Sequence, residues 1–204
     1  MNLSEPLETL FSALEARALR SLARTDAPMS GRQVANVIGS GTPANVRKAL
    51  IRLQQTGLVQ ARATPAATFY SANRDHLLWP AVEICVSARA LLVSKMRELK
   101  RFGPDGTAVW LYGSVARGDS STTSDVDIFI VYPNDRIPVL RENLEHAIRT
   151  DVWLWTGNQV EIVAVESRDF ISMRAARDPL VSSLETDAII AFGPLPHEIG
   201  TSVF

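Results

Sequence analysis

Two short motifs in the second half of the chain carry residue types that could do chemistry together. The first is Gly113-Ser114, which follows the apolar run 107–112, and the second is Asp125-Val126-Asp127, which begins after ten further residues. A glycine turn lets backbone amides approach a phosphate closely, and the serine hydroxyl can donate to the same anion. Strand alternation places Asp125 and Asp127 on one face, where their carboxylates repel each other unless a cation neutralises them. Together the motifs predict a phosphate site beside a magnesium site.

A third carboxylate, Glu161, lies within the apolar run 159–165. Alternation puts it on the strand face that carries Val163 and Val165. An unpaired buried carboxylate is costly, so we expect Glu161 to meet a metal ion or a proton. Each motif alone also has an ordinary explanation. Gly-Ser pairs often connect a strand to a helix, and paired aspartates can be N-capping or surface residues at the start of a strand. The combination of three acids favours a functional site.

Residues from about 105 to 195 resemble the polymerase-beta-type nucleotidyltransferase superfamily, in particular its minimal nucleotidyltransferase branch. The residues that carry the resemblance are Gly113, Ser114, Arg117, Gly118, Ser124, Asp125 and Asp127, with Glu161 in the place of the third carboxylate. The run 187–193 also resembles the last strand of that branch. The third acid of the branch is often Asp, so Glu161 is a departure that makes its role as a base less secure than the metal role of the pair.

The resemblance implies a mixed β-sheet flanked by helices and a metal-dependent transfer reaction. Asp125, Asp127 and Glu161 are the catalytic and metal-ligating candidates, and two Mg²⁺ ions are the implied cofactors. The nucleotide-binding candidates are Gly113, Ser114, Arg117, Gly118 and Ser124. The implied substrate is an NTP, with ATP favoured, and the hydroxyl acceptor is a protein, an RNA or a small molecule that the sequence leaves open.

The first 75 residues follow the order of a winged helix-turn-helix. Apolar spacing predicts a helix over about 5–24 that begins at Ser4, a short helix after Ser30, a second helix after Thr42, and a hairpin formed by 58–62 and 68–71. The segment resembles the winged-helix family, whose recognition helix enters the major groove of double-stranded DNA. The candidate DNA contacts are Asn45, Arg47, Lys48, Arg52 and Arg62. A winged helix that contacts only protein is the alternative.

A long helical pattern over 76–102 connects the two parts. Its apolar residues include Leu78, Val82, Val93 and Met96, and Gly103-Pro104 ends it. The pattern fits either a connector or a dimer seam, and we favour a homodimer because winged-helix proteins often bind two-fold sites. The sequence thus predicts an α+β chain with a winged-helix domain over 1–75, a connecting or dimerisation helix over 76–102 and a nucleotidyltransferase domain over 103–204.

Composition narrows the classes of protein that remain. Residues 1–102 carry 14 Lys and Arg against 7 Asp and Glu, whereas 103–204 carry 7 against 15, which suggests that the first half faces a polyanion. A single cysteine, Cys85, excludes an intramolecular disulfide, and the chain contains no apolar run long enough for a membrane span. We therefore expect a cytoplasmic protein.

Three functions fit these observations. The first is a DNA-binding transcriptional regulator that carries an active nucleotidyltransferase. The second is a regulator whose acidic half binds nucleotide without chemistry. The third is an antitoxin-type minimal nucleotidyltransferase, although an antitoxin of that kind needs no separate DNA-reading domain.

Overall fold

The chain forms two compact units in the computed structural model, which describes residues 1–134 and 138–200. One unit runs from Glu5 to Ala88, and the other combines Met1–Ser4 with the chain from Arg89 onward. The expected nucleotidyltransferase domain over 103–204 includes both undescribed stretches, 135–137 and 201–204. The fold class is α+β, as expected. Within the described residues, no helix combines the length and apolar character that crossing a membrane requires.

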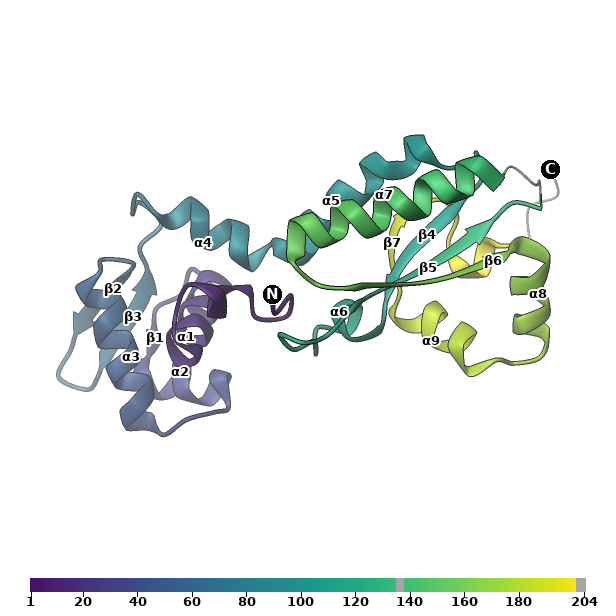
Figure 1. The fold of residues 1–204 in the computed structure, drawn as a ribbon. Helices are drawn as coiled ribbons and strands as arrows, with labels where there is room; N and C mark the ends of the chain where they lie inside the picture. Colours follow the sequence, from purple (N-terminus) through teal and green to yellow (C-terminus); the bar gives the residue numbers. More distant parts are fainter. Residues whose placement is uncertain (135–137, 201–204) are drawn as a thin grey trace. The chain divides into compact units, whose positions relative to one another are not determined.

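The unit Glu5–Ala88 has the element order of a winged helix-turn-helix (Figure 1). Its elements are η1 (Pro6–Thr9), α1 (Ala13–Ala23), β1 (Met29–Ser30), α2 (Gly31–Ile38), α3 (Pro43–Gln55), β2 (Val59–Ala63), β3 (Thr68–Ala72) and α4 (Trp79–Val86). The three strands form an antiparallel sheet in the order β1-β3-β2. The core of this unit contains buried apolar residues from α1, α2 and α3, such as Leu19, Val34 and Leu50.

The caps that the sequence indicates fix the ends of α2 and α3. The Ser30 hydroxyl accepts a hydrogen bond from the Gln33 amide at 3.3 Å, and Gly39 closes α2 at φ 63°. Thr42 caps α3 by accepting from the Asn45 amide at 3.3 Å. Both helices therefore begin where the sequence predicts.

The expected single helix over 5–24 is wrong, because the structure divides it. Pro6 begins only a short 3₁₀ turn, and α1 starts at Ala13 with Ser12, not Ser4, as its N-cap. The reason is a capping box: the Ser12 amide donates to Glu15 Oε2 at 3.1 Å. Capping Ser12 has extended backbone, which interrupts the helix at that point.

The segment 76–102, expected as one long helix, contains α4, α5 (Ala88–Glu98) and the 3₁₀ turn η2 (Leu99–Phe102). The division falls at Ser87. Trp79 and Val82 of α4 are buried in the core of the unit Glu5–Ala88, whereas Leu92 of α5 is buried in the core of the other unit. Of the apolar residues that suggested one dimer seam, Val82 therefore belongs to one core and Val93 and Met96 to the other, whereas Leu78 is exposed.

The second unit is built on a four-stranded mixed sheet. After α5 and η2 come β4 (Ala108–Tyr112), α6 (Gly113–Arg117), β5 (Val126–Tyr132), α7 (Pro138–Thr156), β6 (Val160–Glu166), α8 (Ser167–Ala175), α9 (Pro179–Asp187), β7 (Ile189–Phe192) and η3 (Pro196–Glu198). The strand order is β6-β5-β4-β7; β5 and β6 run parallel, and the other neighbours run antiparallel. This is the expected mixed sheet flanked by helices.

Helices cover both faces of this sheet (Figure 1). On one face α5 and α7 pack over Val109, Leu111, Ile128 and Ile130. On the other face α8 and α9 pack over residues that include Trp110 and Phe129, whose rings stack 5.8 Å apart. Alternation along β5 therefore buries both faces of the strand, which explains its nearly continuous apolar sequence.

Candidate nucleotide and metal site

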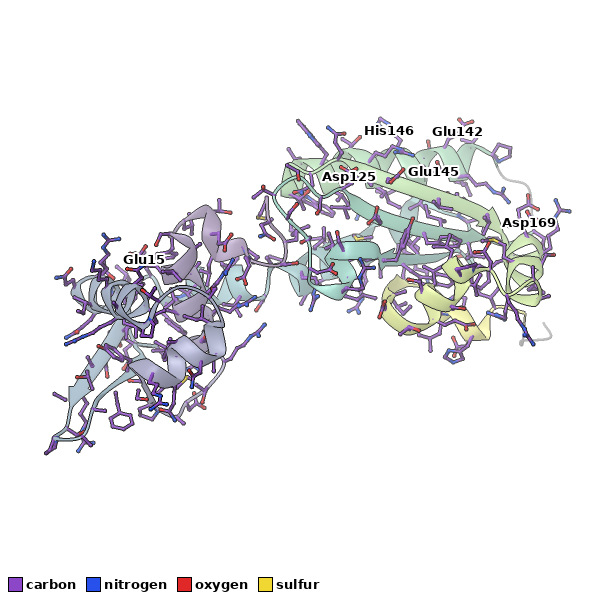
Figure 2. The ribbon with its side chains drawn as sticks, turned by 90° about the horizontal axis from the view of Figure 1, so that it is seen from below. Glu15, Asp125, Glu142, Glu145, His146 and Asp169 are labelled. Atoms are coloured by element: carbon purple, nitrogen blue, oxygen red, sulfur yellow. The ribbon has the colours of Figure 1, made fainter. Side chains whose placement is uncertain are left out.

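The predicted site residues converge at one end of the mixed sheet, where β4 ends and β5 and β6 begin. Tyr112 of β4 pairs with Asp127 of β5, and Asp127 pairs in parallel register with Glu161 of β6. Residues directly opposite each other in a sheet share a face, so these three side chains form a row across it. Asp125 lies two residues before Asp127, directly ahead of β5 (Figure 2). The three predicted carboxylates therefore lie at the same end of the sheet.

Gly113 is required at its position for two separate reasons. Its φ of 68° lies in the left-handed region, which disfavours residues with a Cβ. A Cβ at this position would also lie only 2.8 Å from Asp127 Cγ and would overlap the carboxylate itself. The Asp127 carboxylate is therefore seated directly against the Gly113 turn, so the two motifs form one structural site.

The residues after Gly113 form a single short helical turn whose end is well defined. Gly118 closes α6 at φ 81°, and the amides of Gly118 and Asp119 both donate to the Ser114 carbonyl, at 3.0 and 3.1 Å. Within the described part of the chain, the Ser114 hydroxyl makes no hydrogen bond, which leaves it available to a ligand. Arg117 is exposed, and its Nε donates to Asp119 Oδ2 at 3.3 Å.

The carboxylates influence one another electrostatically. Burial raises the pKa of Asp127, and the negative charges of Glu161 and Asp125 raise it further, whereas Arg117 opposes the shift. The pKa of Tyr112 is raised by burial and by the charges of Asp127 and Glu161. Mutual repulsion of this kind marks a place where a cation would be stabilised.

Glu161 is exposed, so the expectation that burial forces it onto a metal ion or a proton is wrong. The reason is its position: it is the second residue of β6, at the edge of the sheet, beyond the core that includes Val163 and Val165. Its register beside Asp127 remains the basis for placing it in the site.

The donor chemistry fits a hard divalent cation, because all three candidate ligands are carboxylates and the charges of Asp125 and Glu161 act on Asp127. Across residues 1–134 and 138–200, however, no three Asp, Glu, His or Cys side chains are grouped so that they could hold a metal ion. The donor types therefore suit the cation, and the three carboxylates would need side-chain rearrangement to bind it together.

Asn158 positions the loop that presents Asp125, and the sequence interpretation did not select it. This buried amide donates from Nδ2 to the Ser124 carbonyl at 2.8 Å and to the Met1 carbonyl at 3.0 Å. Next to it, the Val126 amide donates to the Gln159 carbonyl at 2.8 Å. Its only local signal is its place after Gly157, directly before β6, where an Asn commonly stabilises a turn.

The remaining predicted residue, Ser124, shapes the same loop. Its hydroxyl accepts from the Ser121 amide at 2.9 Å. Ser120 is buried nearby, and its amide donates to the Ser4 hydroxyl at 2.9 Å, so residues 1–4 help to hold the loop. Long-range contacts of this kind leave no mark in the local sequence.

Arg89 supports α6 from α5. Its Nη1 donates to the Ala116 carbonyl at 2.9 Å and more weakly to the Val115 carbonyl at 3.4 Å. These are carbonyls at the end of the helical turn, which a cation stabilises. No sequence signal connects Arg89 to a turn more than twenty residues away.

The five candidate DNA contacts all lie in the other unit and are exposed. Asn45, Lys48 and Arg52 follow one another at helical spacing on α3, opposite buried residues such as Val46 and Leu50, while Arg47 lies on the other exposed flank and Arg62 on β2. Arg52 also forms an ion pair with Glu15 of α1 at 3.6 Å, a residue labelled in Figure 2.

The charge asymmetry is smaller than the division at residue 102 suggested. The unit Glu5–Ala88 carries nine Lys and Arg against six Asp and Glu, whereas the rest of the chain carries twelve against sixteen. The asymmetry between the two structural units is smaller than that between 1–102 and 103–204 because five basic residues before residue 102 belong to the sheet-containing unit. They are Arg89, Lys95, Arg97, Lys100 and Arg101. The unit Glu5–Ala88 is therefore only modestly basic.

Comparisons with known proteins support part of this assignment. Residues 94–176 match the model of the nucleotidyltransferase domain family, and this range contains every predicted nucleotide- and metal-site residue. No curated protein matches the chain.

Solved structures give only distant similarities. One is a mutant of Lactococcus lactis ZitR, with 20% identity over 47% of this chain and 64% of that one and a TM-score of 0.34. Another is a toxin-antitoxin with AMP-PNP, with 18% identity over 50% of this chain and 73% of that one and a TM-score of 0.34. A third is TrmBL2, an archaeal chromatin protein, with 16% identity over 86% of this chain and 74% of that one and a TM-score of 0.33. The chain spans slightly less than two thirds of ZitR. These scores are too low to infer a common fold, so no function is transferred from these proteins.

Proposed function

We propose that the sheet-containing unit transfers a nucleotidyl group from an NTP, with ATP favoured, to a hydroxyl acceptor. The observation that carries the proposal is the seat of the Asp127 carboxylate against the Gly113 turn, in register with Glu161. A glycine turn for phosphate and carboxylates for a cation are then adjacent, as a bound metal-nucleotide complex requires. The family match over 94–176 supports the same chemistry.

Each residue has a proposed role in this reaction. Asp125 and Asp127 would hold Mg²⁺, which when bound neutralises charge on the triphosphate and on the leaving pyrophosphate. The Gly113 amide and the Ser114 hydroxyl would orient the terminal phosphates, with Arg117 beside them. Glu161 would accept the proton of the acceptor hydroxyl. The hydroxyl oxygen of the acceptor forms a bond to the α-phosphorus as the bond between the α-phosphorus and pyrophosphate breaks.

Pyrophosphate release tests turnover. Purified protein is incubated with Mg²⁺, an extract of its native cells as the source of acceptor, and each NTP in turn. We expect release with the wild type and background levels with the double variant Asp125→Asn and Asp127→Asn. Asp105→Asn is the control, because it removes one carboxylate from an exposed position outside the site. Equal release from the double variant and the control would refute the proposal.

A second candidate is a nucleotide-sensing regulator without chemistry. The observation that favours it is that Asp125, Asp127 and Glu161 do not form a group of three metal ligands in the part of the chain that the structure describes. This function predicts NTP binding that depends on Asp127 but no pyrophosphate release. Equilibrium dialysis with labelled ATP, run beside the release assay, distinguishes the two candidates.

We further propose that the unit Glu5–Ala88 binds double-stranded DNA through α3 and the β2-β3 wing, and that the protein regulates transcription as a homodimer. The support is the exposed row of Asn45, Lys48 and Arg52 on α3, together with Arg62 on the wing. Lys and Arg at such positions contact phosphates, and each contact increases the salt dependence of binding.

Gel-shift titration of a random-sequence duplex at increasing salt tests this proposal. We expect Lys48→Gln to weaken binding and to reduce the salt slope by about 1. Lys100→Gln is the control, because it removes the same charge from the other unit. If Lys48→Gln binds like the wild type, α3 does not make the proposed contact, and if the wild type itself binds no duplex, the unit contacts something other than DNA. Sedimentation equilibrium tests the dimer separately.

A further inference from the structure

A cavity of about 450 Å³ lies entirely within the winged-helix unit, between α1 and α2. One side of it carries Arg17, Arg20 and Arg24 together with the single carboxylate of Glu5, and the other side is apolar, formed by Met29, Val37 and Ile38. Its volume is in the range of small-molecule sites, roughly 300–1,000 Å³. None of these residues belongs to the proposed DNA contacts or to the nucleotide site.

The positive charge of the cavity is only partly matched. Arg20 forms an ion pair with Glu5 at 2.7 Å, and Arg17 forms one with Glu8 at 3.3 Å. Arg24 is exposed, and among the described residues it has neither a hydrogen bond nor an ion pair. The three arginines are spaced by three and four residues along and just beyond α1, so they line one face of it.

One of the lining residues, Arg17, also has an unsatisfied donor. Arg17 Nε is buried and, in the described part of the chain, donates to no acceptor. A buried donor without an acceptor costs free energy, about 1–3 kcal/mol in general, so an anionic oxygen at this position would be stabilised.

We propose that this cavity binds a small organic anion with an apolar body, a carboxylate or a phosphate monoester. The arginines would hold the anionic group, with Arg24 supplying the unmatched charge. Met29, Val37 and Ile38 would cover the apolar part, since Val37 is 63% exposed without a ligand. An inorganic anion would satisfy only the cationic side.

The site is connected to the turn between α2 and α3. Arg17 Nη1 donates to the Ser40 hydroxyl at 2.8 Å, and Ser40 lies directly between Gly39, which closes α2, and the residues that lead into α3. A ligand oxygen near Arg17 would compete with Ser40 for this guanidinium. Binding is therefore expected to reach the turn as well as the cavity.

An NMR titration of the full-length ¹⁵N-labelled protein with phenyl phosphate tests the inference. We expect shifts at the amides of Arg24, Val37, Ile38 and Ser40, with at least tenfold weaker binding in Arg24→Gln. The exposed Arg24 side chain makes no hydrogen bond or contact ion pair within the described residues, so this variant is expected to fold like the wild type. Arg32→Gln is the matched control: it removes one exposed arginine from α2 outside the cavity, and it should bind like the wild type.

Three further probes separate the contributions to binding. Benzoate should bind if a carboxylate suffices, and binding of phenyl phosphate alone would assign the site to phosphate monoesters. Inorganic phosphate should bind at least tenfold more weakly than phenyl phosphate. The inference is overturned if phenyl phosphate shifts none of the cavity amides, if Arg24→Gln binds it as tightly as Arg32→Gln, or if benzyl alcohol binds equally well.

Discussion

Replacing Gly113 by alanine should weaken nucleotide binding at the proposed site in a protein that still folds. The substitution has two costs that can be read from the structure. The first is conformational, because a φ of 68° costs an L-residue about 1–2 kcal/mol. The second is steric, because the new Cβ would overlap the Asp127 carboxylate and push it from its seat.

Gly106→Ala provides the matched comparison. Gly106 lies before the same strand, β4, at φ 81°, and an added Cβ would meet only Pro133 Cβ at an ordinary 3.9 Å. It carries the conformational cost without the steric one. Both variants should therefore lose about 1–2 kcal/mol of unfolding free energy, with any excess in Gly113→Ala reporting the displaced carboxylate.

Urea denaturation and equilibrium dialysis with Mg²⁺ and labelled ATP measure the two effects. We expect Gly106→Ala to bind the nucleotide like the wild type and Gly113→Ala to lose at least tenfold in affinity. The reasoning would be refuted if Gly113→Ala, folded at the assay temperature, bound the nucleotide as tightly as Gly106→Ala. In that case the contact between the turn and Asp127 would have no functional meaning.

Three further predictions concern the elements around the two proposed sites. Asn158→Ala should lower the urea unfolding free energy by about 1–3 kcal/mol, because the buried Ser124 and Met1 carbonyl contacts are lost. Thr42→Ala should cost about 1 kcal/mol by removing the cap of α3, measured as faster amide exchange in its first turn. The hydrogen bond from Ser12 lowers the pKa of Glu15, so this contribution to stability is present above the ordinary carboxylate pKa and is lost as pH falls through the lowered one. Urea titrations at several acidic pH values should show that Glu15→Gln removes this part of the pH dependence.

Much of the fold could be predicted because its signals are local. Ser30, Gly39 and Thr42 mark the ends of two helices through side-chain caps and a left-handed glycine. Alternation placed Asp127 with Asp125 on one face of a strand and Glu161 with Val163 and Val165 on one face of another, and the parallel register of β5 and β6 brings Asp127 and Glu161 together.

The parts that were not predicted depend on contacts between distant residues. The division of 76–102 follows from which core each apolar residue joins, and periodicity alone does not carry that information. The roles of Asn158 and Arg89 arise from hydrogen bonds to loops more than twenty residues away. The exposure of Glu161 depends on where α8 and α9 leave the sheet uncovered, which only the packed structure defines.

The central claim is nucleotidyl transfer at Asp125 and Asp127, and the position of the transferred label tests it most directly. Protein, Mg²⁺ and native-cell extract are incubated with ATP labelled with ³²P at either the α- or the γ-phosphate. We predict that an acceptor is labelled from the α position only, and that Asp127→Asn abolishes the labelling. Labelling from the γ position, labelling that survives Asp127→Asn, or no labelling from any α-labelled NTP would contradict the account.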